Sequence, residues 1–368
     1  MARKIIRSIK LRAGKIFYGI SHMFVSQKSA MTNEEADKSL NNYYPKYAWG
    51  GGCITFNKIA DNPQYDLQII IPCYNVEKYV EECLDSVLNQ KTQYSFLVVV
   101  VNDGSTDSTG EILRKYENIA NVKIITQKNG GHSAARNAGL KNIESKYIMF
   151  VDSDDFILPG CIENLMSAAL QTGASIVEGG CYNLVDGRKE INVVHEAGHV
   201  PARSLQGYPW LKIYKAELFS DVCFPNGLWF EDTINQFLIY WKAQIAYCIS
   251  DMVYVYRQVA TSVSHTYREN KKAIDTYYVT EQILQDAKKL SFSFGTDYLY
   301  LYLRQVLCNY TRLKLCPKNV REAVFIKESN LLSLFDKDAN VSKRHKQLYK
   351  FLTCKDFGKY ELWCKTHR

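Results

Sequence analysis

From residue 67 onward, short hydrophobic runs alternate with stretches in which apolar residues recur every three or four positions. We predict a buried strand in each of four compact apolar runs: 67–71, 96–101, 122–126 and 147–151. Helical spacing lies between them, over residues 77–90, about 108–117 and 133–143. Strands and helices that alternate in this way predict an α/β fold, in which a mainly parallel central sheet is flanked by helices.

Other patterns flank this region. Residues 3–25 have helical spacing, with isoleucines along one face and arginine and lysine interleaved on the other side, which predicts an N-terminal amphipathic helix. Residues 26–65 are polar and rich in aromatic residues and glycine, and they predict an irregular connector. After about Tyr267 the chain becomes helical and tyrosine-rich. We therefore expect three domains: 1–65, 66–265 and a helical C-terminal extension over 266–368.

Composition and charge narrow the choice of partners. The 368 residues are 46% hydrophobic and 23% charged, as in ordinary globular proteins. The net charge of +8 is concentrated near the N-terminus, and the rest of the chain mixes both signs, so we expect no nucleic-acid partner. The N-terminal helix either contacts an anionic membrane surface peripherally or packs on the protein itself. The helical extension could pack against a second copy in a homodimer.

Cysteine usage and hydropathy indicate the compartment. The 11 cysteines are scattered, without metal-finger spacing, and several lie inside apolar segments. This is typical of reduced, buried thiols in a cytoplasmic protein. No apolar run reaches the roughly 20 residues that span a bilayer. We predict a cytoplasmic location, with peripheral attachment to the cytoplasmic face of the membrane left open.

Polar loops follow the predicted strands, where parallel sheets bind their ligands. After the first strand, we expect Pro72 to end the strand, Tyr74 to offer a ring face and Asn75 to offer a donor and an acceptor. After the second, Asp103 could accept a hydrogen bond from a nucleobase. Within the third predicted helix, Arg136 contributes a planar guanidinium cation. Taken singly, the first two loops are also consistent with simple turns.

An acidic loop follows the fourth strand. Asp152, Asp154 and Asp155 fall within four residues, and their mutual repulsion is hard to explain unless a cation offsets it. Hard oxygen ligands suit Mn²⁺ or Mg²⁺, although a solvated acidic turn is the simpler alternative. Further on, Asp232 follows two aromatic residues and Glu231, where it could be a general base or only begin a helix. His265 could be a metal ligand or structural.

In their order and spacing, these motifs resemble the family 2 inverting glycosyltransferases of the GT-A fold. The resemblance covers roughly residues 66–265. It is carried by the segments 72–75, 102–107, 135–139 and 152–155, and by the later acidic pair 231–232. The fold that it implies is a GT-A nucleotide-sugar-binding domain, and each motif alone would be a weak signal.

The resemblance also implies a role for each matched residue. A nucleotide-sugar donor, with UDP expected, would be bound by Pro72, Tyr74, Asn75, Asp103, Arg136, Asp152 and Ser153. A Mn²⁺ or Mg²⁺ ion would be held by Asp154 and Asp152, with His265 as a looser match. Asp232 would be the catalytic base that takes the proton from the acceptor hydroxyl, and attack opposite the leaving group would invert the sugar.

The acceptor is not specified by these motifs. A glycan or lipid-linked oligosaccharide, in surface polysaccharide biosynthesis, fits the basic N-terminus. A nucleotidyltransferase of similar fold is a rival, but it needs a glycine-rich triphosphate loop after the first strand, where this chain has residues 72–75. A non-catalytic glycan-binding or scaffold protein is the second rival. The joint presence of four acids argues against it: Asp103, Asp152, Asp154 and Asp232.

Overall fold

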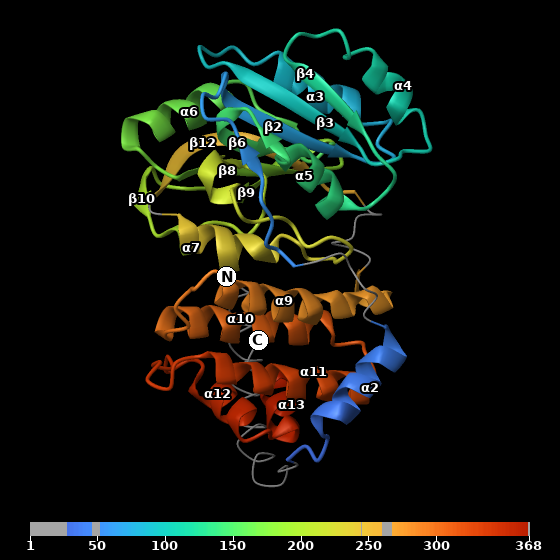
Figure 1. The fold of residues 1–368 in the computed structure, drawn as a ribbon, viewed down its shortest axis with the longest axis vertical. Coiled ribbons are helices and arrows are strands. Elements are labelled where there is room, and N and C mark those ends of the chain that lie inside the picture. Colours follow the sequence, from blue (N-terminus) through green and yellow to red (C-terminus); the bar gives the residue numbers. More distant parts are fainter. Residues whose placement is uncertain (1–27, 46–51, 244, 260–266, 367–368) are drawn as a thin grey trace. The chain divides into compact units, whose positions relative to one another are not determined.

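A computed structural model describes residues 28–45, 52–243, 245–259 and 267–366, and contacts divide the chain into two compact units (Figure 1). We call Trp49–Ser262 the sheet unit, and Met1–Ala48 together with Val263–Arg368 the helical unit. The predicted N-terminal amphipathic helix and His265 lie outside the described residues. Among those described, no helix combines the length and apolar character needed to cross a bilayer.

The sheet unit is built on a ten-stranded mixed sheet. The four predicted strands pair in parallel with one another: β2 (Tyr65–Cys73), β3 (Phe96–Asn102), β4 (Val122–Thr126) and β6 (Ser145–Phe150). The main path runs β10-β12-β8-β11-β6-β2-β3-β4. Its other members are β8 (Ile176–Val185), β10 (Gly198–Val200), β11 (Lys212–Lys215) and β12 (Ala246–Arg257), while β7 (Phe156–Ile157) pairs with β12 and β9 (Arg188–Val193) with β8. The predicted α/β fold with a flanked central sheet is confirmed.

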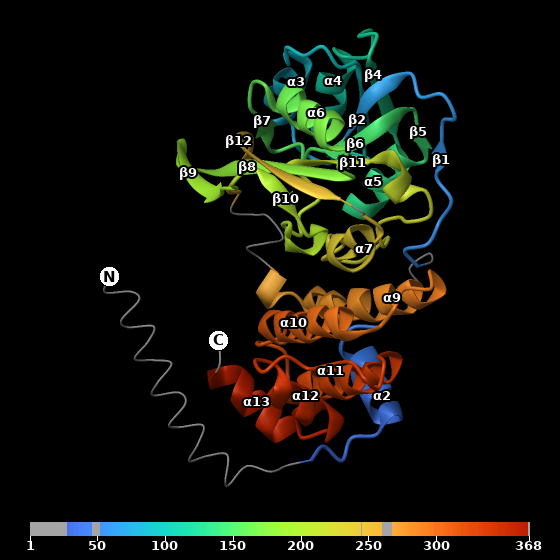
Figure 2. The same cartoon turned by 90° about the vertical axis from the view of Figure 1, so that its left-hand side faces the viewer.

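Helices cover both faces of this sheet because its strands are apolar on both sides. Ile69 and Ile71 pack in one core with α3 (Val80–Leu88), α4 (Thr109–Arg114) and α6 (Cys161–Thr172). Between them, Ile70 points to the other face, against Gly139 of α5 (His132–Leu140). Figure 2 shows α3, α4 and α6 on one side of the sheet and α5 and α7 (Tyr240–Lys242) on the other.

The segment 26–65 differs from the irregular connector that we expected. Asn33–Tyr43 form helix α2, which begins with a capping box between Thr32 and Glu35 and buries Ala36 and Leu40 one turn apart. It belongs to the helical unit and packs on α11 (Lys318–Leu331), where Lys327 pairs with Asp37 at 2.8 Å. Strand β1 (Lys58–Ile59), in contrast, pairs with β5 (Asn142–Ile143) in the sheet unit.

The predicted C-terminal extension is helical as expected. Besides α11, it contains α9 (Asp275–Lys289), α10 (Thr296–Arg312), α12 (Lys346–Thr353) and α13 (Phe357–Thr366). Many of its tyrosines are core residues, and Tyr277, Tyr298 and Tyr302 are almost fully buried. The abundance of tyrosine in this part of the sequence is therefore explained by packing inside the unit.

Candidate active site

The loops after β2 and β3 lie against each other at the carboxyl edge of the sheet. Asn75, whose φ is +53°, accepts a hydrogen bond from the Thr106 N–H at 2.8 Å and donates its own N–H to the Ser105 hydroxyl at 3.1 Å. Tyr74 is 45% exposed. Pro72 does not end β2 as predicted, because it still pairs in register with Val101. The pairing of β2 with β6 stops at Ile70, so a residue without an N–H is tolerated there.

Asp103 is buried and fastens this edge to the segment after β4. Its Oδ1 accepts hydrogen bonds from Gln127 Nε2 at 2.7 Å and from the Gly130 N–H at 2.9 Å. Its Oδ2 accepts from the Gly131 N–H at 2.8 Å. A carboxylate oxygen has two lone pairs, so Oδ2 retains one for a donor such as a nucleobase N–H. Sequence reasoning found Asp103 but missed these partners.

In the acidic loop, the three carboxylates have different surroundings. Asp155 is 1% exposed and accepts hydrogen bonds from the Tyr254 hydroxyl and the Arg257 N–H, both at 2.7 Å. Burial and then the charges of Asp154 and Asp152 raise the pKa of Asp155 well above its usual range. Asp155 therefore holds the loop to β12, a structural task.

The carboxylate of Asp154 has different surroundings from that of Asp155. Burial and then the charge of Asp152 raise the pKa of its carboxyl group, and no other described residue donates a hydrogen bond to that carboxylate. Arg257 contacts only its backbone carbonyl, at 2.9 Å from Nε. A half-buried carboxylate beside a second acid is unfavourable unless a cation joins it. The residues present thus fit a divalent metal, with Asp154 as the main ligand. Ser153, next to it, is buried.

Arg136 joins the acidic loop to the later acidic pair. It projects from α5, is 2% exposed, and donates from Nη2 to Asp152 Oδ1 at 2.7 Å and from Nη1 to Glu231 Oε1 at 2.6 Å. Burial alone would lower its pKa, but the charges of Asp152 and Glu231 outweigh burial and raise the pKa of Arg136. Both Nη atoms are occupied by protein carboxylates, so the side chain is built to hold two loops together.

The acidic pair itself sits on a strained turn. Phe230, directly before Glu231, has φ +64°, a conformation that costs a bulky residue about 1–3 kcal/mol and is concentrated at functional sites. After Asp232 the chain enters a π-helical turn, Asn235–Ile239, an element that is also frequent at such sites. Within the pair, Glu231 is the member that Arg136 holds in place.

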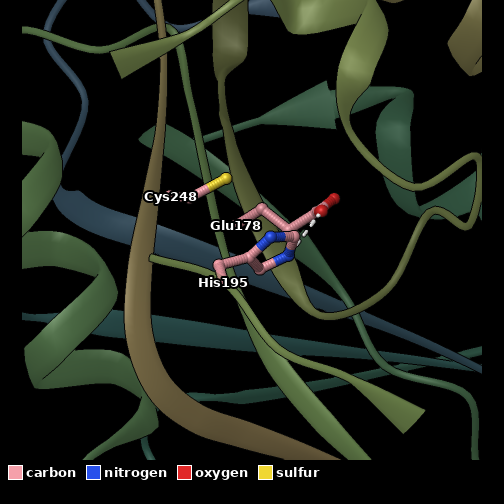
Figure 3. Close-up of side chains that lie close together, drawn as sticks. All are labelled: Glu178, His195 and Cys248. Carbon is pink, nitrogen blue, oxygen red and sulfur yellow. Dashed lines mark ion pairs between the residues drawn. The ribbon is translucent and has the colours of Figure 1, made fainter. Parts of the chain in front are cut away.

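Sequence reasoning missed a second polar cluster in the sheet unit. Glu178 on β8, His195 and Cys248 on β12 place their ligand-type atoms within 4.8 Å of one another (Figure 3). Glu178 is fully buried, lies 2.9 Å from His195 Nε2 and forms an ion pair with Lys212, which is also fully buried. Hydrogen bonds to Cys248 and then to Glu178 raise the pKa of His195 to about 9. No local sequence pattern predicts this cluster, because Glu178, its ion-pair partner Lys212, His195 and Cys248 come from four separate segments of the chain.

The known proteins that this chain resembles are glycosyltransferases. The model of glycosyl transferase family 2 matches residues 68–230. Glycosyltransferase GlyG of Streptococcus pneumoniae is 30% identical over 241 residues, which are 60% of this chain and 80% of GlyG. Glycosyltransferase GlyA of the same species is 32% identical over 223 residues, 55% of this chain but only 32% of GlyA, so this chain spans about a third of that relative.

Among solved structures, residues 1–349 of TarS from S. aureus, in complex with UDP-GlcNAc, have a similar fold. The TM-score is 0.65 at 24% identity, and the match covers 80% of this chain and 89% of that one. At this level of identity, the likeness concerns the fold.

Proposed function

The chain belongs to glycosyl transferase family 2, and from this premise we propose that it transfers a sugar from a UDP-sugar to a hydroxyl group of a glycan or lipid-linked oligosaccharide, with inversion. The observation that carries the proposal is the convergence of the Asp103 loop, the acidic loop and the Glu231–Asp232 turn, the last two joined by Arg136. Family membership argues against the rival nucleotidyltransferase. UDP is proposed because TarS, which shares the fold, was solved with UDP-GlcNAc.

On the donor side, the loops after β2 and β3 would bind the nucleotide. Asp103 is held rigidly by the backbone of residues 130–131 and keeps a lone pair for the base, while Tyr74 offers its exposed ring. Asp154, with the Asp152 oxygen that Arg136 leaves free, would hold Mn²⁺ or Mg²⁺. When bound, such an ion neutralises the negative charge that develops on the diphosphate leaving group.

On the acceptor side, Asp232 would accept the proton of the attacking hydroxyl. A positioned base of this kind is worth about 10²–10⁴-fold in rate. Arg136 would set its position, because the guanidinium fixes the neighbouring Glu231 against the acidic loop. Attack from the face opposite the diphosphate inverts the anomeric carbon, and an NMR product analysis that found retention would contradict the proposal.

The decisive experiment measures nucleotide release from UDP-, GDP- and dTDP-sugars with Mn²⁺, with and without chelator. We expect chelator-sensitive release from a UDP-sugar, and its loss in Asp154→Asn. Asp186→Asn is the matched control, because Asp186 is an exposed acid in a turn of the same unit and asparagine tolerates its positive φ. Wild-type protein that neither releases nucleotide nor is stabilised thermally by any donor would favour a scaffold role.

The cellular setting of the reaction is also a proposal. TarS is named a poly(ribitol-phosphate) β-N-acetylglucosaminyltransferase, and for this chain we propose a surface polysaccharide as the acceptor. Peripheral attachment at the cytoplasmic membrane face would depend on residues 1–25. Their deletion should reduce sedimentation with anionic vesicles, and unchanged sedimentation would argue against attachment.

A further inference from the structure

A stack of aromatic rings lies between the acidic loop and the Asp232 turn. Trp210 is nearly parallel to three tyrosine rings: its ring centroid is 4.4 Å from Tyr208, 4.8 Å from Tyr254 and 5.2 Å from Tyr256, with interplanar angles of 2°, 15° and 9°. Trp210 and Tyr254 are buried, whereas Tyr208 is 36% exposed. Tyr208 is thus the ring of this stack that reaches solvent most.

The two ends of the stack adjoin the two acidic segments of the candidate site. At the buried end, the Tyr254 hydroxyl donates to Asp155 at 2.7 Å and accepts the N–H of Asp152 at 3.1 Å. At the exposed end, the carbonyl of Gly207, next to Tyr208, accepts a hydrogen bond from Asn235 Nδ2 at 2.8 Å, and the Asn235 N–H donates to the Asp232 carbonyl at 3.0 Å. The segment that carries the exposed ring is therefore joined to the turn that carries the proposed base.

Buried side chains hold the segment that carries Tyr208 in place. The Gln206 N–H donates to Glu178, and its carbonyl accepts from Lys212 and from the Tyr240 hydroxyl. The carbonyl of Gly207 accepts from Asn235 Nδ2 at 2.8 Å. These bonds to one N–H and two carbonyls restrict the segment, and an aromatic ring on a rigid support binds at low entropic cost.

The buried polar cluster is better explained as an anchor for this segment than as a metal site. Cys248, Glu178 and Lys212 are aligned in register across β12, β8 and β11, on one face of the sheet. Although Glu178, His195 and Cys248 have ligand chemistry, the Lys212 ammonium already supplies the positive charge that the Glu178 carboxylate requires. A buried ion pair adds little net stability compared with apolar residues. Because Glu178 and Lys212 both bond to the backbone of Gln206, the ion pair anchors the segment that carries Tyr208.

We propose that Tyr208 is the platform on which a sugar ring of the acceptor stacks, beside Asp232. The inference rests on the proposed transfer reaction and adds to it the chemical class of the acceptor's reacting end. One face of a pyranose carries C–H groups, and an exposed tyrosine ring removes that apolar face from water while leaving the hydroxyls at the rim for reaction. An open-chain polyol phosphate has no such face.

The test uses the full chain with UDP and saturation-transfer difference NMR. Methyl glycosides of glucose, galactose and N-acetylglucosamine are the probes, and ribitol phosphate is the ring-free comparison. We expect saturation of the C–H protons of at least one glycoside, with ribitol phosphate silent. Tyr208→Ala should weaken glycoside binding about tenfold or more, while Tyr208→Phe keeps it because the ring remains.

Matched controls separate the platform from the proposed reaction. Phe56→Ala removes another exposed ring of the same unit, 87% exposed, and should change nothing. UDP-sugar binding by the wild type and by Phe56→Ala is measured alongside, because it tests the proposed donor site independently of the acceptor. Equal glycoside binding by Tyr208→Ala and wild type, or no glycoside binding by wild type, would overturn the platform. Absence of any donor binding by the wild type would instead overturn the proposed function.

Discussion

Replacing Arg136 by methionine tests whether one buried cation holds the candidate active site together. The substitution keeps most of the side-chain length but removes the guanidinium that bonds Asp152 at 2.7 Å and Glu231 at 2.6 Å. Removing one partner of a buried ion pair costs about 3–5 kcal/mol, because the remaining charge is left uncompensated. The side chains of Asp152 and Glu231 are 15% and 17% exposed, so water reaches them slightly, and we expect a loss near the lower end, about 3 kcal/mol.

The assay is urea unfolding at pH 7 with a chelator present, so that a divalent ion cannot replace the lost cation. Arg188→Met is the control, since Arg188 is an exposed arginine on β9 and should lie within about 0.5 kcal/mol of wild type. Adding Asp152→Asn and Glu231→Gln to Arg136→Met should recover much of the stability, because neutral amides leave no buried charge.

Two outcomes would refute this reasoning. A loss below about 1 kcal/mol in Arg136→Met would mean that the two carboxylates are solvated well enough without the arginine. A triple variant no more stable than Arg136→Met would mean that the guanidinium acts through packing, for example over the Phe224 ring at 5.4 Å.

Three further predictions concern sites away from this bridge. Burial raises the pKa of Glu328 to about 8, so between about pH 4.5 and 8 the native state holds a proton that the unfolded state has lost. As the pH rises through this range, the free energy of unfolding of wild type should fall by up to ~1.4 kcal/mol per pH unit relative to Glu328→Gln. A difference between the two proteins that does not change with pH in urea unfolding would contradict this. Gly139→Ala would place a Cβ 2.5 Å from Ile70 Cγ2 and should destabilise by about 1–3 kcal/mol in the same assay, whereas an unchanged midpoint would show that α5 can shift. Because the Lys212 ammonium supplies the positive charge that a metal ion would, we expect wild type and Cys248→Ser to contain the same amount of zinc, measured by elemental analysis after dialysis. Stoichiometric zinc in wild type that is lost in Cys248→Ser would show a metal site.

The loops of the candidate site were predictable from local pattern. The strand Phe96–Asn102 is apolar on both faces, which a strand needs when helices cover both sides of a parallel sheet. The carboxyl ends of parallel strands meet at one edge, so the order of the strands along the chain was enough to place Asp103 and the acidic loop together. Local pattern could not show that Pro72 lies inside β2. Proline is tolerated there because the pairing of β2 with the neighbouring strand β6 has already ended.

Only the tertiary structure decided what each charged group contacts. The sequence by itself determined the α/β class, the loops that follow the strands and the acids on them. Nothing local to Arg136 shows that its partners lie 16 and 95 residues away, nor that Lys212 is fully buried against Glu178. The physical reason is that periodicity reports which face of an element is apolar, whereas contacts between distant segments depend on strand register and packing, which no short window of sequence encodes.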